Sequence, residues 1–298
     1  MALALAWVAR TDIGRRREQN EDAWAGEARA PAGAPPRGLF AVCDGMGGHA
    51  GGEEASALAV DALRRSLAWC LSEPWPEPAA LSGRVRDAML LANRAIHDRN
   101  EGRQDKGRAG TTAVLLLVSG TDVCLAHVGD SRLYQITAAG VRQLTADHNV
   151  AGVDIARGGD PAQAWARPDA RHLVQALGPR PDEHVRPDVQ LLTVEEDSLF
   201  LLCSDGVSDN GFVERQERAL LRPLLAPAAD LEAGGQALIE AANAANGHDN
   251  LTVVLVRITG ASGTRPRGRV PTTARVRRTT TASARRGGVF RRLLGGGR

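Results

Sequence analysis

Short apolar segments that end at Gly, Asp or Ser constrain the fold of this chain more than any other feature. Each is rich in Val, Leu and Ile and is short enough to form a single strand. Eight such segments are present: Leu3–Arg10, Leu39–Cys43, Thr112–Val118, Asp122–His127, Arg132–Ile136, Val189–Val194, Leu199–Cys203 and Leu251–Ile258. Turn signals such as Ser119-Gly120 and Ala139-Gly140 join neighbouring segments. The pattern therefore predicts antiparallel hairpins.

Three further segments have the periodicity of helices with one apolar face. The first, Glu53 to Leu71, aligns Val60, Leu63, Leu67 and Cys70. The second, Leu81 to Arg99, aligns Val85, Met89, Ala92 and Ile96. A third helix is predicted over Leu231–Ala245. Residues 146–178 have no clear periodicity, so we expect an irregular insertion there, of the kind that forms functional loops or lids.

Basic charge is concentrated at the C-terminal end of the chain. Residues 261–298 contain 11 arginines and no acidic residue, whereas the rest of the chain has 26 basic and 35 acidic residues. The chain therefore divides into an acidic body, residues 1–260, and a basic tail that we expect to be disordered. Three interpretations of the tail stay open: a solvated extension, a contact for an acidic partner or nucleic acid, and a regulatory segment phosphorylated at Thr279–Thr281.

The cysteines and the hydrophobic runs indicate a cellular compartment. Cys43, Cys70, Cys124 and Cys203 are far apart and form no CxxC pair. Packed, reduced thiols are favoured over a disulfide framework or a zinc site. The N-terminus is apolar first and basic afterwards, which is the reverse of a secretory signal. No apolar run approaches the ~20 residues that span a bilayer, so we predict a cytoplasmic protein without a membrane span.

Aspartates recur at the ends of the strand-like segments. Asp44 follows FAVC, Asp130 follows LAHVG, Asp205 follows FLLCS, and Asp249 precedes NLTVVLV. Carboxylates at strand ends can converge at one edge of a sheet, where they repel each other unless a cation lies between them. Mg²⁺ and Mn²⁺ are the usual ions for such oxygen ligands. The pattern therefore favours a site for a divalent metal ion.

Two other interpretations of Asp44 are weaker. Gly45, Gly47 and Ala50 fit the dinucleotide-binding pattern G-x-G-x-x-A. In that pattern, however, Asp44 would direct a negative charge at the pyrophosphate, and the other strands do not lie in βαβ units. A helix cap is disfavoured because Asp44 is too far upstream of the helix body. Metal ligation explains this residue best.

Six motifs, in order between residues 7 and 258, carry a resemblance to a known family. They are TDIGRRREQNEDAW at 11–24, DGMGGHAGGE at 44–53, GTT at 110–112, HVGDSR at 127–132, LCSDGVSD at 202–209 and GHDNLTVVLV at 247–256. Together they resemble the PP2C (PPM) family of metal-dependent serine/threonine protein phosphatases, and its bacterial members most of all. The resemblance implies an α+β fold, an α-β-β-α sandwich of two antiparallel β-sheets flanked by helices. Residues 1–260 would form this domain, with a flap at about 146–178.

The resemblance also implies roles for individual residues. Asp44 would bridge two Mn²⁺ or Mg²⁺ ions, and Gly45 would offer its backbone carbonyl to one of them. The other metal positions that it implies are Asp205 and Asp249 as ligands, Glu21 and Asp22 as an acidic pair that acts on metal-bound water or as an outer ligand, and Asp130 at a third, weaker ion. Arg17 would bind the substrate phosphate, for which a guanidinium is suited because it pairs with two oxygens at once.

The general acid is the point at which the sequence departs from the wider family. Eukaryotic relatives have a histidine directly after the Asp-Gly pair, where this chain has Met46. A metal-bound water or His49 is left as the candidate acid, and a structural hydrogen bond is the favoured role of His49. His127 and His148 are interpreted as structural. The middle of the insertion also departs from the family pattern, and a polar position that some relatives have there falls near Arg171.

The sequence therefore predicts a cytoplasmic phosphatase that hydrolyses phosphoserine and phosphothreonine on proteins by direct attack of a metal-bridging water. Its natural counterpart would be a serine/threonine kinase. The alternative is a catalytically silent binding module with the same fold. Nucleic-acid binding would be confined to the basic tail.

Overall fold

Each of the eight predicted strands is present in the computed structural model, which describes residues 3–47, 51–102 and 108–261. The strands in these residues pair antiparallel throughout. One sheet has the order β1-β11-β10-β7-β8, and the other has the order β2-β3-β5-β6-β9 with β4 beside β3. The strands are β1 Ala4–Asp12, β2 Asp22–Arg29, β3 Arg37–Met46, β4 Gly110–Thr111, β5 Ala113–Ser119, β6 Asp122–Val128, β7 Arg132–Thr137, β8 Gly140–Gln143, β9 Asp188–Thr193, β10 Ser198–Cys203 and β11 Leu251–Thr259.

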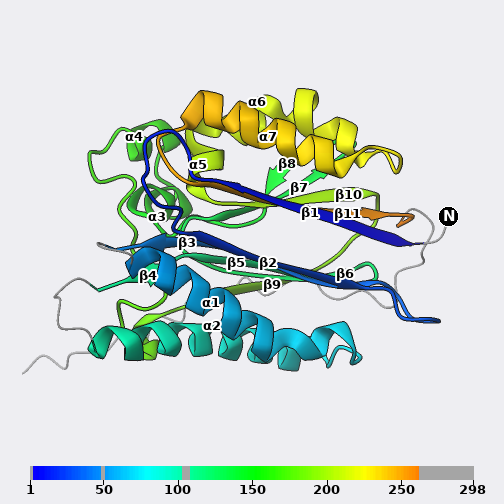
Figure 1. Cartoon of the computed structure of the whole chain (residues 1–298), viewed down its shortest axis with the longest axis horizontal. Coiled ribbons are helices and arrows are strands. Elements are labelled where there is room, and N and C mark those ends of the chain that lie inside the picture. The colour runs from blue at the N-terminus through cyan, green and yellow to red at the C-terminus, as the bar shows by residue number, and fades with distance from the viewer. Residues whose placement is uncertain (1–2, 48–50, 103–107, 262–298) are drawn as a thin grey trace, which may run out of the picture.

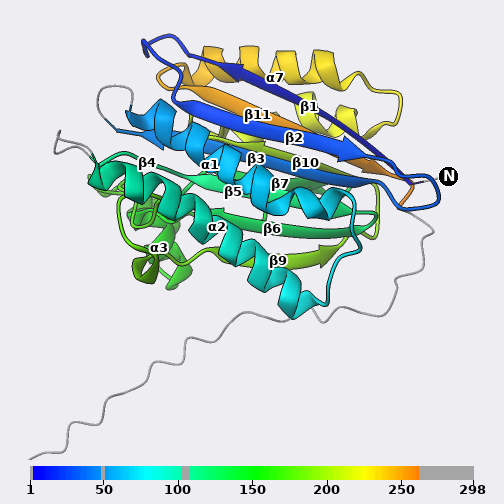
Figure 2. The same ribbon diagram turned by 60° about the horizontal axis from the view of Figure 1, so that its bottom comes forward.

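Helices cover the outer face of each sheet, so the fold has four layers (Figure 1). α1 and α2 lie across the sheet that contains β3, and Figure 2 shows these two helices in front of it. α7 lies across the other sheet. The helices are α1 Gly51–Leu67, α2 Pro78–Glu101, α3 Val150–Ala156, α4 Pro161–Trp165, α5 Asp205–Ser208, α6 Phe212–Gln216 and α7 Leu231–Asn246. Shorter 3₁₀ or π segments are η1 Ala68–Leu71, η2 Asp182–His184, η3 Asp209–Gly211, η4 Glu217–Leu221 and η5 Arg222–Leu225. This arrangement confirms the predicted α+β sandwich.

Apolar side chains fill the three spaces between these layers. Phe40, Phe200 and Val254 are fully buried between the two sheets. The predicted helix faces point into the neighbouring spaces, and of the eight residues on the first two faces only Val60 is partly exposed. Burying a side chain such as Leu63 stabilises the fold by roughly 1.5–3 kcal/mol. The period of the apolar residues therefore determines which side of each helix meets the sheet.

Three strands were not predicted. β2 has the sequence DAWAGEAR, which contains no Val, Leu or Ile and has little intrinsic tendency to form a strand. It is extended because it pairs along its whole length with β3, from Asp22 opposite Asp44 to Arg29 opposite Arg37. β4 and β8 are two and four residues long, too short to produce a recognisable alternation. Tertiary pairing therefore outweighs local propensity in these segments.

The insertion at 146–178 is more regular than expected, because it contains α3 and α4. The side chain of Asn149 caps α3 by accepting a hydrogen bond from the Gly152 N–H at 2.8 Å. Asp160 caps α4 in the same way through the Gln163 N–H at 2.9 Å. Helices of seven and five residues are too short for the periodicity that identified the longer helices. The prediction of an irregular insertion was therefore wrong over these two segments.

The structure also bears on the state of the cysteines and on the prediction that no segment spans a membrane. All four cysteines are buried and free, which confirms the interpretation of packed thiols. Within the described residues, no helix has the length and apolar character that crossing a bilayer requires. The basic tail lies outside the described residues except for Ala261.

The motif-bearing loops gather at one end of the sandwich. In Figure 1 this is the left end, where α1 begins and where α3, α4 and α5 lie. The first residues of β1 lie at the opposite end. Side chains from both sheets can therefore meet at the left end.

Candidate metal centre

Asp44 lies near the end of β3, where neighbouring threonines hold its backbone. Its N–H donates to Thr112 Oγ1 at 3.0 Å, and its carbonyl accepts from the Thr112 N–H at 2.9 Å and the Thr111 hydroxyl at 2.8 Å. The next residue, Gly45, has no room for a side chain, because a Cβ there would lie 2.2 Å from the Gly52 carbonyl oxygen. The GTT and Asp-Gly motifs therefore fix the position of one carboxylate.

β2 brings the predicted acidic pair to the same place. Asp22 is the register partner of Asp44 across β2 and β3. Its Oδ2 accepts a hydrogen bond from the Ser204 hydroxyl at 2.7 Å, whereas its buried Oδ1 has no partner among the described residues. Glu21 turns toward the first turn of α1, where a Cβ on Gly52 would lie 2.4 Å from the Glu21 Oε1. The two acids therefore face different sides, with Asp22 the deeper one.

The other sheet supplies two more aspartates. Asp205 begins α5 shortly after β10, and Asp249 lies two residues before β11. Because β10 and β11 are antiparallel neighbours, the end of one strand and the start of the other lie together. Gly206 permits this close approach, since a Cβ there would lie 2.1 Å from the Asn250 carbonyl oxygen.

Asn250 ties the N-terminal loop to this edge, and the sequence analysis did not single it out. Its amide nitrogen donates to the carbonyls of Ile13 and Gln19, both at 2.9 Å, and its amide oxygen accepts from the Glu21 N–H at 2.9 Å. These bonds place the loop that carries Arg17 and Glu21. The sequence feature that could have identified Asn250 is its position directly after Asp249 in the GHDN motif.

The turn between β6 and β7 contributes the last carboxylate, Asp130. The Asn149 side chain donates to its Oδ2 at 3.1 Å. Gly129, just before it, has a φ of +104° and lies so close to Thr112 that a Cβ would be 2.6 Å from that side chain. The turn therefore packs directly against the segment that holds Asp44.

These side chains line one pocket of about 270 Å³. Its lining includes Arg17, Glu21, Asp44, Gly45, Met46, Thr112, Asp130, Arg171, Asp205 and Asp249. Asp22 is not part of the lining and lies behind it. The structure thus brings the sequence-predicted residues together, whereas His49 lies outside the described residues. A second cavity of about 710 Å³ adjoins through Arg171 and contains none of the predicted metal ligands.

Burial and mutual repulsion make the pocket unfavourable for ionised carboxyl groups. Burial is the main cause that raises the pKa of Asp22 and of Asp130 to about 7 and that of Asp205 to about 6. It also raises the pKa of Asp44 well above its ordinary value, with repulsion from Asp22 and Asp205 next in importance. A cation among these groups would offset both effects. The oxygen donors and the unpartnered Oδ1 of Asp22 therefore fit a hard divalent ion.

Two arginines face this negative pocket. Arg17 donates to Asp249 Oδ2 at 2.6 Å, and its side chain remains 46% exposed. Its other side-chain nitrogens have no hydrogen-bond partner among the described residues. Arg171 comes from the insertion and pairs with Asp209, which also contacts His248 Nε2 at 3.2 Å. Arg171 therefore links the insertion to the segment that follows Asp205, and Asp209 extends this link to the residue before Asp249.

Comparison with known proteins places this architecture in a family. The family model for protein phosphatase 2C matches residues 14–241. The serine/threonine protein phosphatase PstP of Mycobacterium tuberculosis is 32% identical over 259 residues, which cover 87% of this chain and 46% of PstP. The serine/threonine phosphatase stp of Listeria monocytogenes is 32% identical over 255 residues, 83% of this chain and 93% of its own length. The chain thus spans about half the length of the mycobacterial relative.

A solved structure resembles the whole sandwich. It is the catalytic domain of the serine/threonine protein phosphatase PstP in complex with two manganese ions, with a TM-score of 0.66 and 30% identity. The match covers 87% of this chain and all of that one. The two-sheet fold therefore belongs to the structural class of these protein phosphatases. The chain belongs to the protein phosphatase 2C family, as the six motifs predicted.

Proposed function

We propose that this protein is a metal-dependent serine/threonine protein phosphatase that hydrolyses phosphoserine and phosphothreonine. The observation that carries the proposal is the pocket in which carboxylates from both sheets meet beside the partly exposed Arg17. The bacterial relatives are named serine/threonine phosphatases, and one relative is described with two manganese ions. Mn²⁺ or Mg²⁺ fits the oxygen donors of this pocket.

Specific residues carry the proposed reaction. Asp44 would hold both ions, with the Gly45 carbonyl, Asp205 and Asp249 as further ligands. Glu21 and the deeper Asp22 would orient water near the ions, and Asp130 would belong to a third, weaker ion site. When bound, the ions would lower the pKa of the attacking water and offset the negative charge of the phosphate group.

Arg17 is placed to orient the phosphate. Its guanidinium lies at the pocket, and the nitrogens that do not contact Asp249 are free to pair with phosphate oxygens in a planar fork. In-line attack by water would release the serine or threonine hydroxyl. A covalent phosphocysteine route is disfavoured, because burial raises the pKa of the Cys70, Cys124 and Cys203 thiols to about 12 and leaves them protonated.

The substrates follow from the same chemistry. We infer that they are phosphorylated proteins and that a serine/threonine kinase makes them. Residues 1–260 would form the phosphatase domain, and the buried, free cysteines are compatible with a cytoplasmic location. A catalytically silent module is not favoured, since Arg17, Asp44, Asp205 and Asp249 are all present in the pocket.

The test is hydrolysis of p-nitrophenyl phosphate and of a phosphothreonine peptide by the purified full chain. Turnover is expected with Mn²⁺ or Mg²⁺ and is expected to stop with EDTA or in the Asp205→Ala variant. Asp87→Ala is the matched control, because this exposed aspartate lies on α2, outside the pocket lining. A folded, metal-loaded protein that turns over neither substrate would reject the enzyme and leave the silent module as the better interpretation.

A further inference from the structure

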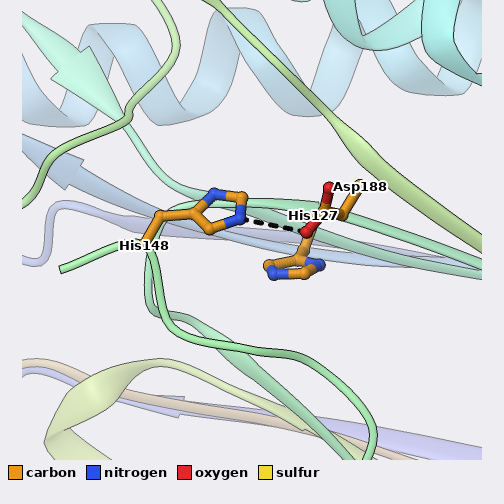
Figure 3. A group of neighbouring side chains, drawn as sticks. All are labelled: His127, His148 and Asp188. Atoms are coloured by element: carbon orange, nitrogen blue, oxygen red, sulfur yellow. Dashed lines mark hydrogen bonds and ion pairs between the residues drawn. The ribbon is translucent and has the colours of Figure 1, made fainter. Parts of the chain in front are cut away.

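A second group of potential metal ligands lies outside the carboxylate pocket lining. His127 is near the end of β6, Asp188 begins β9, and His148 lies in the segment that leads into α3 (Figure 3). Their ligand atoms all lie within 4.8 Å of one another. His127 and Asp188 are register partners across β6 and β9, so two of the three groups are held by paired strands. We call these three residues the histidine cluster.

The buried ring of His127 has one free lone pair. The residue is 0% exposed, and its Nε2 lies 2.8 Å from the Ala146 carbonyl oxygen. A carbonyl only accepts hydrogen bonds, so Nε2 carries the proton and Nδ1 is left with a lone pair. Nδ1 has no hydrogen-bond partner among the described residues. Burial lowers the pKa of this ring to about 4, which keeps it neutral at physiological pH.

A metal ion is a natural partner for that nitrogen. Metal-binding histidines usually donate their other ring N–H to a carbonyl or carboxylate, which sets the tautomer and the ring orientation. The hydrogen bond from His127 Nε2 to Ala146 already has this form. An unsatisfied buried polar atom costs about 1–3 kcal/mol, and coordination through Nδ1 would remove that cost.

His148 and Asp188 complete the set. The two imidazole rings are stacked, with centroids 4.5 Å apart. His148 Nδ1 accepts a long 3.2 Å hydrogen bond from the Gly129 N–H, so its Nε2 carries the proton and donates to Asp188 Oδ2 at 3.3 Å. Coordination through Nε2 would move the ring proton to Nδ1, so metal bonds would replace the contact between Nε2 and Asp188, and the long contact with the Gly129 N–H would be given up. The Asp188 side chain is 58% exposed, which gives an ion access from solvent.

We propose that His127, His148 and Asp188 form a separate binding site for a borderline transition-metal ion, with Zn²⁺ as the best-suited ion. Two imidazoles and one carboxylate match the nitrogen and oxygen ligands that Zn²⁺ accepts, and water would fill the remaining position. Mg²⁺ prefers oxygen donors, so it does not compete effectively at two nitrogens. The ion would tie β6 and β9 to the start of the insertion that carries Arg171. This inference goes beyond the proposed phosphatase activity.

Co²⁺ is the probe for the test, because its visible absorption reports nitrogen ligation. The full chain is titrated with Co²⁺ in excess Mg²⁺, which occupies oxygen-donor sites. The wild-type protein is expected to bind about one Co²⁺ at this site with visible absorption bands that Zn²⁺ displaces. Asp188→Asn is expected to weaken that binding about tenfold or more, and His127→Gln to abolish the bands.

Asp122→Asn is the matched control. Asp122 lies at the other end of β6, and its carboxylate contacts Thr193 of β9 at 3.1 Å. The carboxylate pocket is unchanged in Asp122→Asn and Asp188→Asn, so a difference between these variants reports on the histidine cluster alone. Asp188 is half exposed, and the amide of its Asn variant can still accept from His148, so this variant should fold. Equal Co²⁺ affinity and equal spectra in wild type and Asp188→Asn would overturn the proposal.

Discussion

The carboxylate pocket and the histidine cluster are two groups of potential ligands built in different ways. The pocket gathers oxygen donors from both sheets, and their burial and mutual repulsion raise the pKa values of the aspartates. The histidine cluster is carried by one strand pair and the adjoining segment, and burial keeps His127 neutral. The first arrangement needs positive charge, whereas the second offers a lone pair.

Two groups of this kind would allow one fold to separate two kinds of metal ion. Hard ions such as Mg²⁺ gain most where several anionic oxygens must be neutralised. Borderline ions gain from imidazole nitrogen even where the net charge of the site is small. Asp130 and the histidine cluster are linked through Gly129, whose N–H contacts His148. The carboxylate pocket and the histidine cluster are therefore neighbours, one with oxygen donors and the other with nitrogen donors.

The largest expected effect is a loss of phosphatase activity that occurs on mutation of the carboxylate pocket and not of the histidine cluster. Asp44→Ala removes the carboxylate proposed to contact both catalytic ions, so kcat for a phosphothreonine peptide should fall by about 10³-fold or more. Asp188→Asn, in the histidine cluster, should leave kcat within about twofold. Steady-state kinetics in Mn²⁺ measure both. Equal losses in the two variants would mean that the groups do not act separately.

The next effect concerns residues 13–21, the loop that brings Arg17 and Glu21 to the carboxylate pocket and has no role in the histidine cluster. Asn250→Ala removes three hydrogen bonds that hold residues 13–21, and it should lower the free energy of unfolding by about 1–3 kcal/mol. Urea denaturation measures this change. Gln236→Ala on the exposed face of α7 is the control and should stay within about 0.5 kcal/mol. A similar value for both variants would show that Asn250 does not position the loop.

Arg17→Lys should produce a smaller change that is confined to phosphate binding. Lysine keeps the positive charge but cannot pair with two phosphate oxygens in a planar fork. We expect kcat/KM for the phosphopeptide to fall about tenfold, which corresponds to about 1.4 kcal/mol. Co²⁺ binding at the histidine cluster should not change. An unaltered kcat/KM would remove Arg17 from the site.

The last comparison is a pair of opposite pH dependences in the metal-free protein. Asp130 has a pKa of about 7 in the fold against an ordinary value of 3.8, so between these values the folded state binds more protons. Its contribution to stability therefore falls as pH rises from about 4 to 7. His127 has a pKa of about 4 against 6.5, so there the unfolded state binds more protons, and its contribution rises over that range.

Urea denaturation in EDTA between pH 5 and 7 tests both signs. Relative to wild type, Asp130→Asn should make the free energy of unfolding rise more, or fall less, with increasing pH. His127→Gln should change the slope in the other direction. Adding Mn²⁺ should reduce the Asp130 effect, because a bound cation favours the ionised carboxylate. Parallel curves for all three proteins would contradict these pKa assignments.

Much of the fold was predictable because its information is local. Eight strands and three helices follow from the period of apolar residues, and their positions are confirmed to within a few residues. β2 was missed, because DAWAGEAR becomes a strand only through its pairing with β3. The short helices α3 and α4 were missed because their caps, Asn149 and Asp160, precede segments too short to show a period.

The family and the chemical type of the main site could be predicted from local sequence, since the motifs place Asp44, Asp205 and Asp249 next to apolar strands and the strand pattern brings strand ends together. Which side chains face each other depends instead on how the strands pair and pack. Asp22 lies opposite Asp44 because of the β2–β3 register, and Asn250 reaches a loop more than 200 residues earlier in the chain. His127, His148 and Asp188 became a group in the same way. Contacts between distant residues depend on register and packing, which no local pattern records.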